Sequence, residues 1–98
     1  MKKLVHLSIQ GKVQGVGYRA FVELQADLFD LEGWVRNRRD GSVEAIVEGS
    51  GEAVEAFIKE CWKGPPAALV KRVDVNDGDP ELLALRAPGG KFVMLPTV

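Results

Sequence analysis

Hydrophobic and polar residues alternate along residues 4–10, the first patterned stretch of the chain. Apolar side chains take its odd positions and polar ones its even positions (Val5, Leu7, Ile9; His6, Ser8, Gln10). Successive side chains of a strand point to opposite faces, so this pattern predicts a strand with one buried face. The only histidine, His6, then lies on the polar side, where we expect a surface or edge residue.

Residues 33–49 predict a β-hairpin. Two runs rich in strand-forming residues flank Asp40-Gly41, a dipeptide suited to a tight primed turn because glycine accepts a positive φ. In the second run apolar residues recur at every other position (Val43, Ala45, Val47).

Two other stretches have the spacing of helices. The first follows the glycine-rich segment and ends before Gly33; its apolar positions are Phe21, Val22, Leu24, Leu28, Phe29 and Leu31. The second spans residues 51–63, with Ser50 as N-cap and Pro65-Pro66 beyond its end. Its apolar stripe consists of Val54, Phe57, Ile58 and Cys61.

The rest of the chain predicts two more strands, over residues 69–75 and 91–96, separated by a polar, turn-rich segment at 76–90. Pro96 favours an edge position for the last strand, because proline cannot donate a ladder hydrogen bond. The resulting order is βαββαβ plus a short final edge strand. This order predicts an α+β, ferredoxin-like sandwich, an antiparallel sheet with two helices on one face.

Right-handed crossovers would leave the first two strands of this sheet parallel, with the third inserted between them. The carboxyl ends of the first two strands then share one rim. We expect the glycine-rich segment and the hairpin tip to meet there.

Composition limits the classes of protein that fit. The chain has 98 residues, 46% of them hydrophobic, and a formal net charge of -1. This size predicts a single domain over 1–98, and the charge argues against a protein that coats nucleic acid. One cysteine and one histidine exclude an internal disulfide and a structural zinc site. No segment reaches the ~20 apolar residues of a membrane span. We expect a monomer in the cytoplasm.

The segment "GKVQGVGYRAF", residues 11–21, is a candidate anion site. Glycines at 11, 15 and 17 would let successive backbone N–H groups turn towards one centre, next to the positive end of a helix. Arg19 follows in the first helical turn, where the dipole disfavours a cation unless an anion compensates it. A plain strand-to-helix turn with a solvated arginine explains the same residues equally well.

Two familiar phosphate motifs fit poorly here. "GVGYRA" matches G-x-G-x-x-A, but the chain is too short for a dinucleotide fold, and Asn37 stands where an acidic ribose ligand is expected. A P-loop needs Lys-Ser/Thr after its last glycine, whereas Tyr18-Arg19 follow Gly17.

Asn37 is the candidate second half of the site. It shares a strand face with Val35, the helix-covered face, and would emerge at the rim above the glycine segment. Its carboxamide could orient a water molecule, although an isolated asparagine beside a turn more often serves the turn itself.

Other polar and aromatic residues suggest ordinary roles. We expect Trp34 and Trp62 to be core or partly buried anchors, and Cys61 to be a packed thiol. The glutamates, Glu44 among them, are expected to be solvated. Arg36, Arg38 and Arg39 could form a basic patch around Asn37 that attracts an anionic substrate.

Together, "GKVQGVGYR" and "GWVRNRRDGSVE" closely resemble the two signature motifs of the acylphosphatase family, V-Q-G-V-x-[FY]-R and G-W-V-R-N-x-x-D-G-x-V-E. The resemblance extends over nearly the whole chain. At position 17 a glycine replaces the family's bulky aromatic residue, a departure that leaves Arg19 in place.

The resemblance implies metal- and cofactor-independent hydrolysis of acyl phosphates to a carboxylate and inorganic phosphate. Arg19 and Asn37 then take the catalytic positions. The backbone of Gln14, Gly15, Val16, Gly17, Tyr18 and Arg19 would hold the phosphate, and Asn37 would orient the attacking water. The alternative is a non-catalytic phosphate- or RNA-binding module. No strand carries the aromatic pair of an RNA-recognition sheet, so no nucleic-acid partner is expected.

Overall fold

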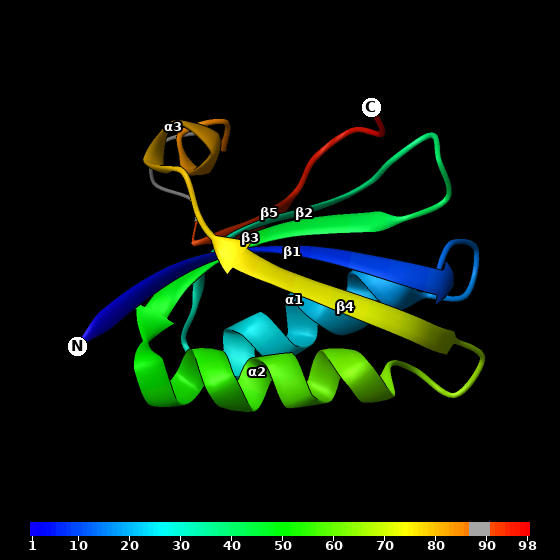
Figure 1. Cartoon of the computed structure of the whole chain (residues 1–98), viewed down its shortest axis with the longest axis horizontal. Coiled ribbons are helices and arrows are strands. Elements are labelled where there is room, and N and C mark those ends of the chain that lie inside the picture. Colours follow the sequence, from blue (N-terminus) through cyan, green and yellow to red (C-terminus); the bar gives the residue numbers. More distant parts are fainter. Residues whose placement is uncertain (87–90) are drawn as a thin grey trace.

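The computed structural model describes residues 1–86 and 91–98, and consists of one twisted sheet with two long helices packed on one side (Figure 1). The elements in chain order are β1 (Lys2–Lys12), α1 (Tyr18–Leu28), β2 (Glu32–Asn37), β3 (Val43–Ser50), α2 (Gly51–Lys63), β4 (Leu69–Asp77), α3 (Pro80–Leu83) and β5 (Phe92–Met94). This order confirms the predicted ferredoxin-like arrangement. Of the predicted turn-rich segment 76–90, residues 87–90 lie outside the described residues.

The sheet has the strand order β4-β1-β3-β2-β5. β3 pairs antiparallel with both β1 and β2, so β1 and β2 run in the same direction, as predicted. At the far edge β5 pairs with β2 in parallel. The sheet was predicted to be antiparallel, and the parallel β2–β5 pair makes it mixed; the predicted edge position of the last strand is confirmed. After β4, at one edge of the sheet, the chain crosses to the opposite edge and forms β5 next to β2. This crossover fixes the direction of β5.

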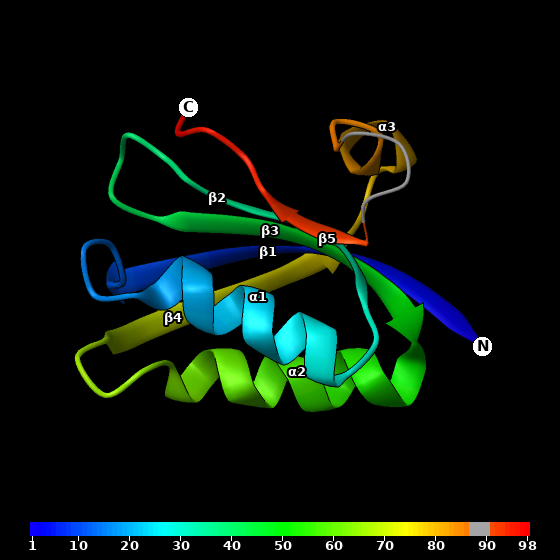
Figure 2. The same cartoon turned by 180° about the vertical axis from the view of Figure 1, so that it is seen from behind.

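The two long helices α1 and α2 cover one face of the sheet (Figure 2). Apolar side chains packed between them and the sheet form the core. The alternating residues of β1 and the stripe of α2 pack there, including Val5, Leu7, Ile9, Val54, Phe57 and Cys61. Ser50 caps α2 through its Oγ, which accepts from Ala53 N at 3.1 Å. Burial raises the pKa of the Cys61 thiol to about 12, which is consistent with a packed thiol and not with a nucleophile.

The opposite face of the sheet carries a short helix that the sequence analysis did not predict, although Asp79 as N-cap and Pro80 in the first turn are local signals for a helix start. α3 lies across this face from α1 and α2 (Figures 1 and 2). Trp34 is fully buried, and its Nε1 donates to the carbonyl of Leu82 in α3 at 2.7 Å. Trp34 therefore belongs to a second apolar layer, whereas Trp62 is 48% exposed and is no core anchor.

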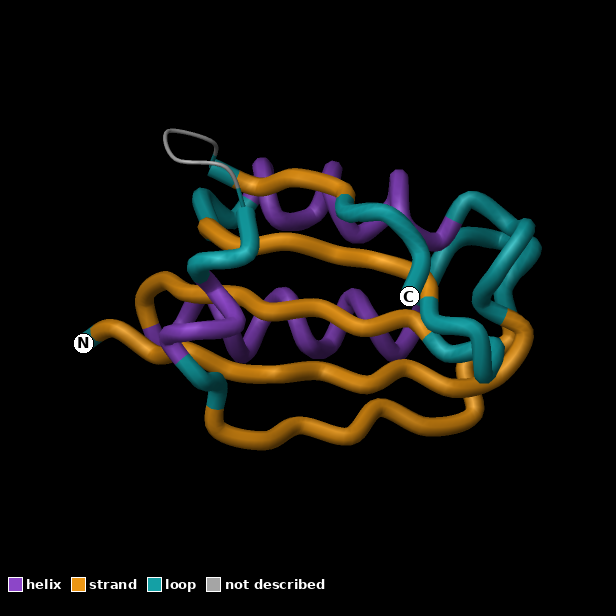
Figure 3. Tube along the Cα trace, turned by 90° about the horizontal axis from the view of Figure 1, so that it is seen from above, coloured by secondary structure: helices purple, strands orange, loops and turns teal. Residues whose placement is uncertain are grey.

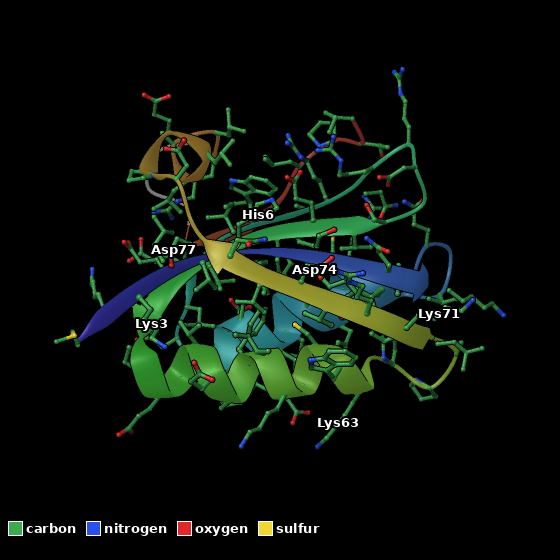
Figure 4. The ribbon with its side chains drawn as sticks, viewed as in Figure 1. Lys3, His6, Lys63, Lys71, Asp74 and Asp77 are labelled. Carbon is green, nitrogen blue, oxygen red and sulfur yellow. The ribbon has the colours of Figure 1, made fainter. Side chains whose placement is uncertain are left out.

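Glu44 is the centre of an ion-pair cluster on this same face, so the expectation of a solvated glutamate was wrong. Its carboxylate meets His6 Nε2 at 2.7 Å, Arg36 Nε at 2.7 Å and Arg38 Nη1 at 3.0 Å. Burial alone would raise the pKa of Glu44, but these three hydrogen bonds outweigh burial and lower it. His6 lies on the sheet face away from the long helices (Figure 4), and the Arg36 guanidinium stacks 4.6 Å from the Trp34 ring centre.

The β2–β3 hairpin closes with three loop residues instead of the predicted two. Arg38 N donates to Ser42 O at 2.9 Å, and Gly41 N donates to Arg38 O at 3.1 Å. Gly41 has a φ of 94° while Asp40 keeps a negative one, which makes a type I turn followed by a glycine bulge. Asp40 accepts from both the backbone N and the Oγ of Ser42, and this capping stabilises the longer loop.

We expect Glu44→Gln to lower the free energy of unfolding by about 1–3 kcal/mol at pH 7, because two arginines lose their buried charge partner. The pKa of Glu44 is lowered in the folded state, so its stabilisation is present above the ordinary glutamate value and is lost as pH falls through the folded value. The gap between parent and variant should therefore narrow at acid pH. Urea unfolding at several pH values measures this.

Glu48→Gln on the same strand is the control, and should change the free energy of unfolding by less than about 0.5 kcal/mol. A constant gap between Glu44→Gln and the parent from neutral to acid pH would contradict the ion-pair explanation.

Candidate active site

The segment after β1, the β2–β3 hairpin and the C-terminal residues lie together at one end of the sheet (Figure 3). A pocket opens there, lined by Val13, Gly15, Gly17, Tyr18, Arg19, Ala20, Asn37 and Met94. Its volume is about 190 Å³, well above the roughly 10–15 Å³ that one enclosed water needs. The pocket therefore has room for a tetrahedral anion and an attacking water, and it contains both residues singled out from the motifs.

Gly15 and Gly17 give the wall of this pocket its shape. Their φ angles are 73° and 81°, in the left-handed region that L side chains rarely adopt. A Cβ on either residue would meet nothing within 4 Å, so their backbone is open on that side. Glycine therefore suits these two positions because of their backbone conformation and not because of crowding.

Gly11 has a different role from the one predicted. It lies inside β1 at a register shift between Gln10 and Gly11 in the pairing with β4. A Cβ there would come within 2.1 Å of the Leu69 carbonyl oxygen. Gly11 therefore allows two strands to approach closely, and it is not among the residues that line the pocket.

The N-terminus of α1 lies at the pocket and has no side-chain cap. Gly17 is the N-cap residue, with no side-chain hydrogen bond, and the first turn of the helix contains no acidic residue. The earliest helical bond runs from Phe21 N to Gly17 O at 3.1 Å. The preceding N–H groups have no intrahelical acceptor, and the helix dipole makes this end electropositive. Such an end favours an anionic ligand.

Arg19 contributes a half-buried cation at this helix end. Within the part of the chain that the structure describes, its guanidinium forms no hydrogen bond or ion pair. Arg36 and Arg38 differ, because both bind Glu44 on the opposite face of the sheet. Of the predicted basic patch only Arg39, at the exposed hairpin tip, is not committed to Glu44. The charge available to a ligand in the pocket is that of Arg19.

Asn37 enters the pocket from the end of β2. It pairs with Val43 of β3, and its side chain is on the helix-covered face as the alternation predicts. Its Oδ1 is buried and has no hydrogen-bond partner among the described residues. Buried acceptors are seldom left unsatisfied, and the exceptions often mark a place for water or ligand. This oxygen is therefore suited to accept a hydrogen bond from a water in the pocket.

The other three residues of the predicted phosphate loop turn their side chains elsewhere. Gln14 points to the hairpin and Val16 packs against the core, and neither is among the described residues that line the pocket. Tyr18 is buried, its OH donates to Cys61 O at 2.6 Å, and burial raises its pKa, so the phenol stays neutral. These residues can contribute backbone N–H groups to the site, but not side chains.

The sequence reasoning missed the part of the site that comes from the last strand. Met94 lines the pocket, and the residues after it continue along β2. Leu95 N donates to Val35 O at 2.9 Å, and Val98 N donates to Asn37 O at 3.2 Å. Arg39 N in turn donates to Val98 O at 2.8 Å. No local pattern signals these contacts, because they join segments that are far apart in the chain.

Neither a metal-binding cluster nor a membrane-spanning helix is present among the described residues. Residues 1–86 and 91–98 contain no group of three or more His, Cys, Asp or Glu side chains placed to hold a metal ion. Over the same ranges, no helix has the length and apolar character needed to span a bilayer.

Comparisons with known proteins agree with the motif resemblance. The family model described as Acylphosphatase matches residues 5–83. An acylphosphatase from Rhodopseudomonas palustris (strain BisB18) is 56% identical over 92 residues, which cover 94% of this chain and 93% of the relative. One from Bradyrhizobium diazoefficiens is 48% identical over 97 residues, covering 99% and 98%. The crystal structure of acylphosphatase from Bacillus subtilis matches with a TM-score of 0.82 at 33% identity, covering 97% of this chain and 99% of that one.

The geometry of the pocket predicts that inorganic phosphate stabilises the fold. A ligand that binds only the folded state raises the free energy of unfolding by about 2.7 kcal/mol at a concentration one hundred times its dissociation constant. We expect added phosphate, at constant ionic strength, to raise the midpoint temperature of unfolding in the parent and not in Arg19→Ala. Arg72→Ala, which removes an arginine bound to Asp74 on β4, is the control and should keep the shift. An equal shift in Arg19→Ala would show that phosphate binds elsewhere.

Proposed function

The chain belongs to the acylphosphatase family and acts as an acylphosphatase, and we propose that Arg19 and Asn37 carry out its reaction in the pocket at the end of the sheet. The single observation that carries this assignment is the convergence of two uncompensated groups on one pocket. These groups are the guanidinium of Arg19 and the buried oxygen of Asn37, both without a partner among the described residues. One binds an anion and the other a proton donor.

The phosphoryl group of the substrate binds between the glycine loop and Arg19. Backbone N–H groups of residues 14–19 and the start of α1 donate to its oxygens, and the guanidinium can bind two of them at once. Phosphoryl transfer proceeds through a loose transition state, with charge spread over the equatorial oxygens. Donors that are already oriented stabilise that charge without reorganising during the reaction.

Asn37 holds the water that attacks phosphorus. Its Oδ1 accepts a hydrogen bond from the water, which directs a lone pair of the water oxygen towards phosphorus. Aligning the water with the leaving oxygen replaces a rare bimolecular encounter with a positioned one. The side-chain amide of Asn37 can also donate to the phosphoryl group.

The bond changes balance without a protein acid or base. The water oxygen forms a bond to phosphorus as the bond from phosphorus to the acyl oxygen breaks, and the electron pair leaves with the carboxylate. The carboxylate is a stable leaving group and needs no proton. The water proton passes to a phosphoryl oxygen, so the products are a carboxylate and inorganic phosphate.

Metal-free turnover, a cytoplasmic location and a monomeric state complete the proposal. Arg19 and the N–H groups supply the positive field that a metal would otherwise provide. The rival function is a phosphate- or RNA-binding module without turnover. It would use the same phosphate cradle, formed by the backbone of residues 14–19 and the Arg19 guanidinium, but would release no phosphate from an acyl phosphate. The buried position of Trp34 and the pairing of Arg36 with Glu44 disfavour RNA binding on the open face of the sheet.

We expect Arg19→Ala to lower kcat/KM for a small acyl phosphate by about 10³-fold or more, because both binding and transition-state charge stabilisation are lost. Arg19→Lys should recover little, since an ammonium cannot bind two oxygens with the planar geometry of arginine. Steady-state release of phosphate, measured with a chelator present, checks this. A chelator-sensitive parent enzyme would contradict the metal-free mechanism.

Asn37→Ala should lower kcat by about 10²-fold while KM and inhibition by phosphate change little, because the water loses its orientation but the cradle stays intact. Asn76→Ala, on the outer edge strand β4, is a matched control and should match the parent. If Asn37→Ala turned over at the parental rate, the assignment of the water to Asn37 would be overturned.

A further inference from the structure

The side chain of Gln14 joins the phosphate loop directly to the hairpin that carries Asn37. Its Nε2 donates to Arg38 O at 2.7 Å and to Ser42 O at 2.8 Å. Both partners are carbonyl oxygens, which only accept, so the nitrogen end of the amide must face them. The two hydrogens of one amide group are therefore both used on the hairpin.

These two carbonyls belong to the residues that close the hairpin loop. Arg38 and Ser42 form the closing pair, in which Arg38 N donates to Ser42 O at 2.9 Å. Ser42 O thus accepts from two donors, one in the hairpin and one in the phosphate loop. Arg38 directly follows Asn37, so the contact reaches the backbone one residue from the amide that we assign to the water.

Strand pairing does not connect these two parts of the site. The pairing of β1 with β3 ends at Ile9 and Val43, before the glycine loop begins. β1 and β2 are not neighbours, because β3 lies between them, and their lateral separation is roughly 9–10 Å. In the described part of the chain, the two Gln14 hydrogen bonds are the ones that join residues 13–19 to residues 37–42.

We infer that Gln14 is a positioning residue, which sets the distance between the phosphate cradle and the Asn37 carboxamide through its two hydrogen bonds to the hairpin. This inference rests on the proposed function. The phosphate cradle holds the phosphoryl group and Asn37 holds the water. The distance from the water oxygen to phosphorus is therefore set by the separation of the two segments that Gln14 joins. A displacement of about 1 Å in such a geometry costs about 10²-fold in rate.

The first test replaces Gln14 with methionine, which has a similar length but no donor. We expect Gln14→Met to lower kcat about 10²-fold, with KM and inhibition by phosphate within about threefold of the parent. Gln10→Met is the matched control, since Gln10 is exposed on β1 and its side chain forms no hydrogen bond within the described residues. The control should retain the parental kcat.

A double-mutant cycle separates positioning from a general loss of structure. If Gln14 acts through Asn37, Asn37→Ala should cost about 10²-fold in the parent, but only a few-fold in the Gln14→Met background. Multiplicative effects would overturn the inference. It would also be overturned if Gln14→Met raised KM and weakened phosphate inhibition while leaving kcat unchanged, because Gln14 would then serve the cradle alone.

Gln14→Glu keeps the inference testable if the methionine variant fails to fold. An ionised carboxylate repels the two carbonyls, whereas the protonated acid has one O–H to donate. We expect kcat of Gln14→Glu, relative to the parent at the same pH, to rise as pH falls through the range in which the introduced carboxylate protonates. A ratio that stays flat with pH would count against the inference. Parental turnover in Asn37→Ala would instead overturn the proposed role of Asn37, on which this inference rests.

Discussion

The position of β3 between β1 and β2 is the constraint on which the site depends. The insertion makes β1 and β2 parallel, so the segments that follow them emerge at the same rim. It also holds those segments two strand spacings apart, a gap of roughly 9–10 Å. If β1 and β2 were adjacent strands, their separation would leave too little room for a phosphoryl group and a water in line. The strand order thus fixes the approximate width of the gap, and the two Gln14 hydrogen bonds to the hairpin set the final spacing of its two sides.

Alternation along β2 assigns its polar residues to two separate tasks. Arg36 and Arg38 project to the open face, where Glu44 of β3 binds both. Asn37, between them, projects to the helix-covered face and into the pocket. The ion pairs hold the backbone on both sides of Asn37 without adding charge to the pocket. Arg19 is the one charged residue among the described residues that line the pocket, so in the proposed mechanism its guanidinium is the side-chain cation that meets the phosphoryl group. The Asn37 oxygen has no competing partner among the described residues.

Features that depend on neighbours in sequence could be predicted, and those that depend on distant contacts could not. The alternation of β1, the stripe of α2 and the Ser50 cap are local, and the motif order led to Arg19 and Asn37. The buried state of Glu44 requires His6, Arg36 and Arg38 to meet it from other positions. α3 has four residues, too few for the apolar spacing of a helix to repeat, and its Leu82 carbonyl accepts from the distant Trp34. The direction of β5 depends likewise on a crossover that no local pattern encodes.

The glycine loop illustrates why a local conflict in a sequence can indicate function. Two left-handed glycines, an uncapped helix and a cation at the positive end of the helix dipole each cost folding free energy, the cation about 0.3–1 kcal/mol. Nothing in the described residues compensates Arg19. A bound phosphoryl group would satisfy the open N–H groups and the guanidinium together, so the same features that weaken the empty protein strengthen the complex. Glycine at position 17 fits this logic, because its φ of 81° turns the chain into the helix without a side chain over the pocket.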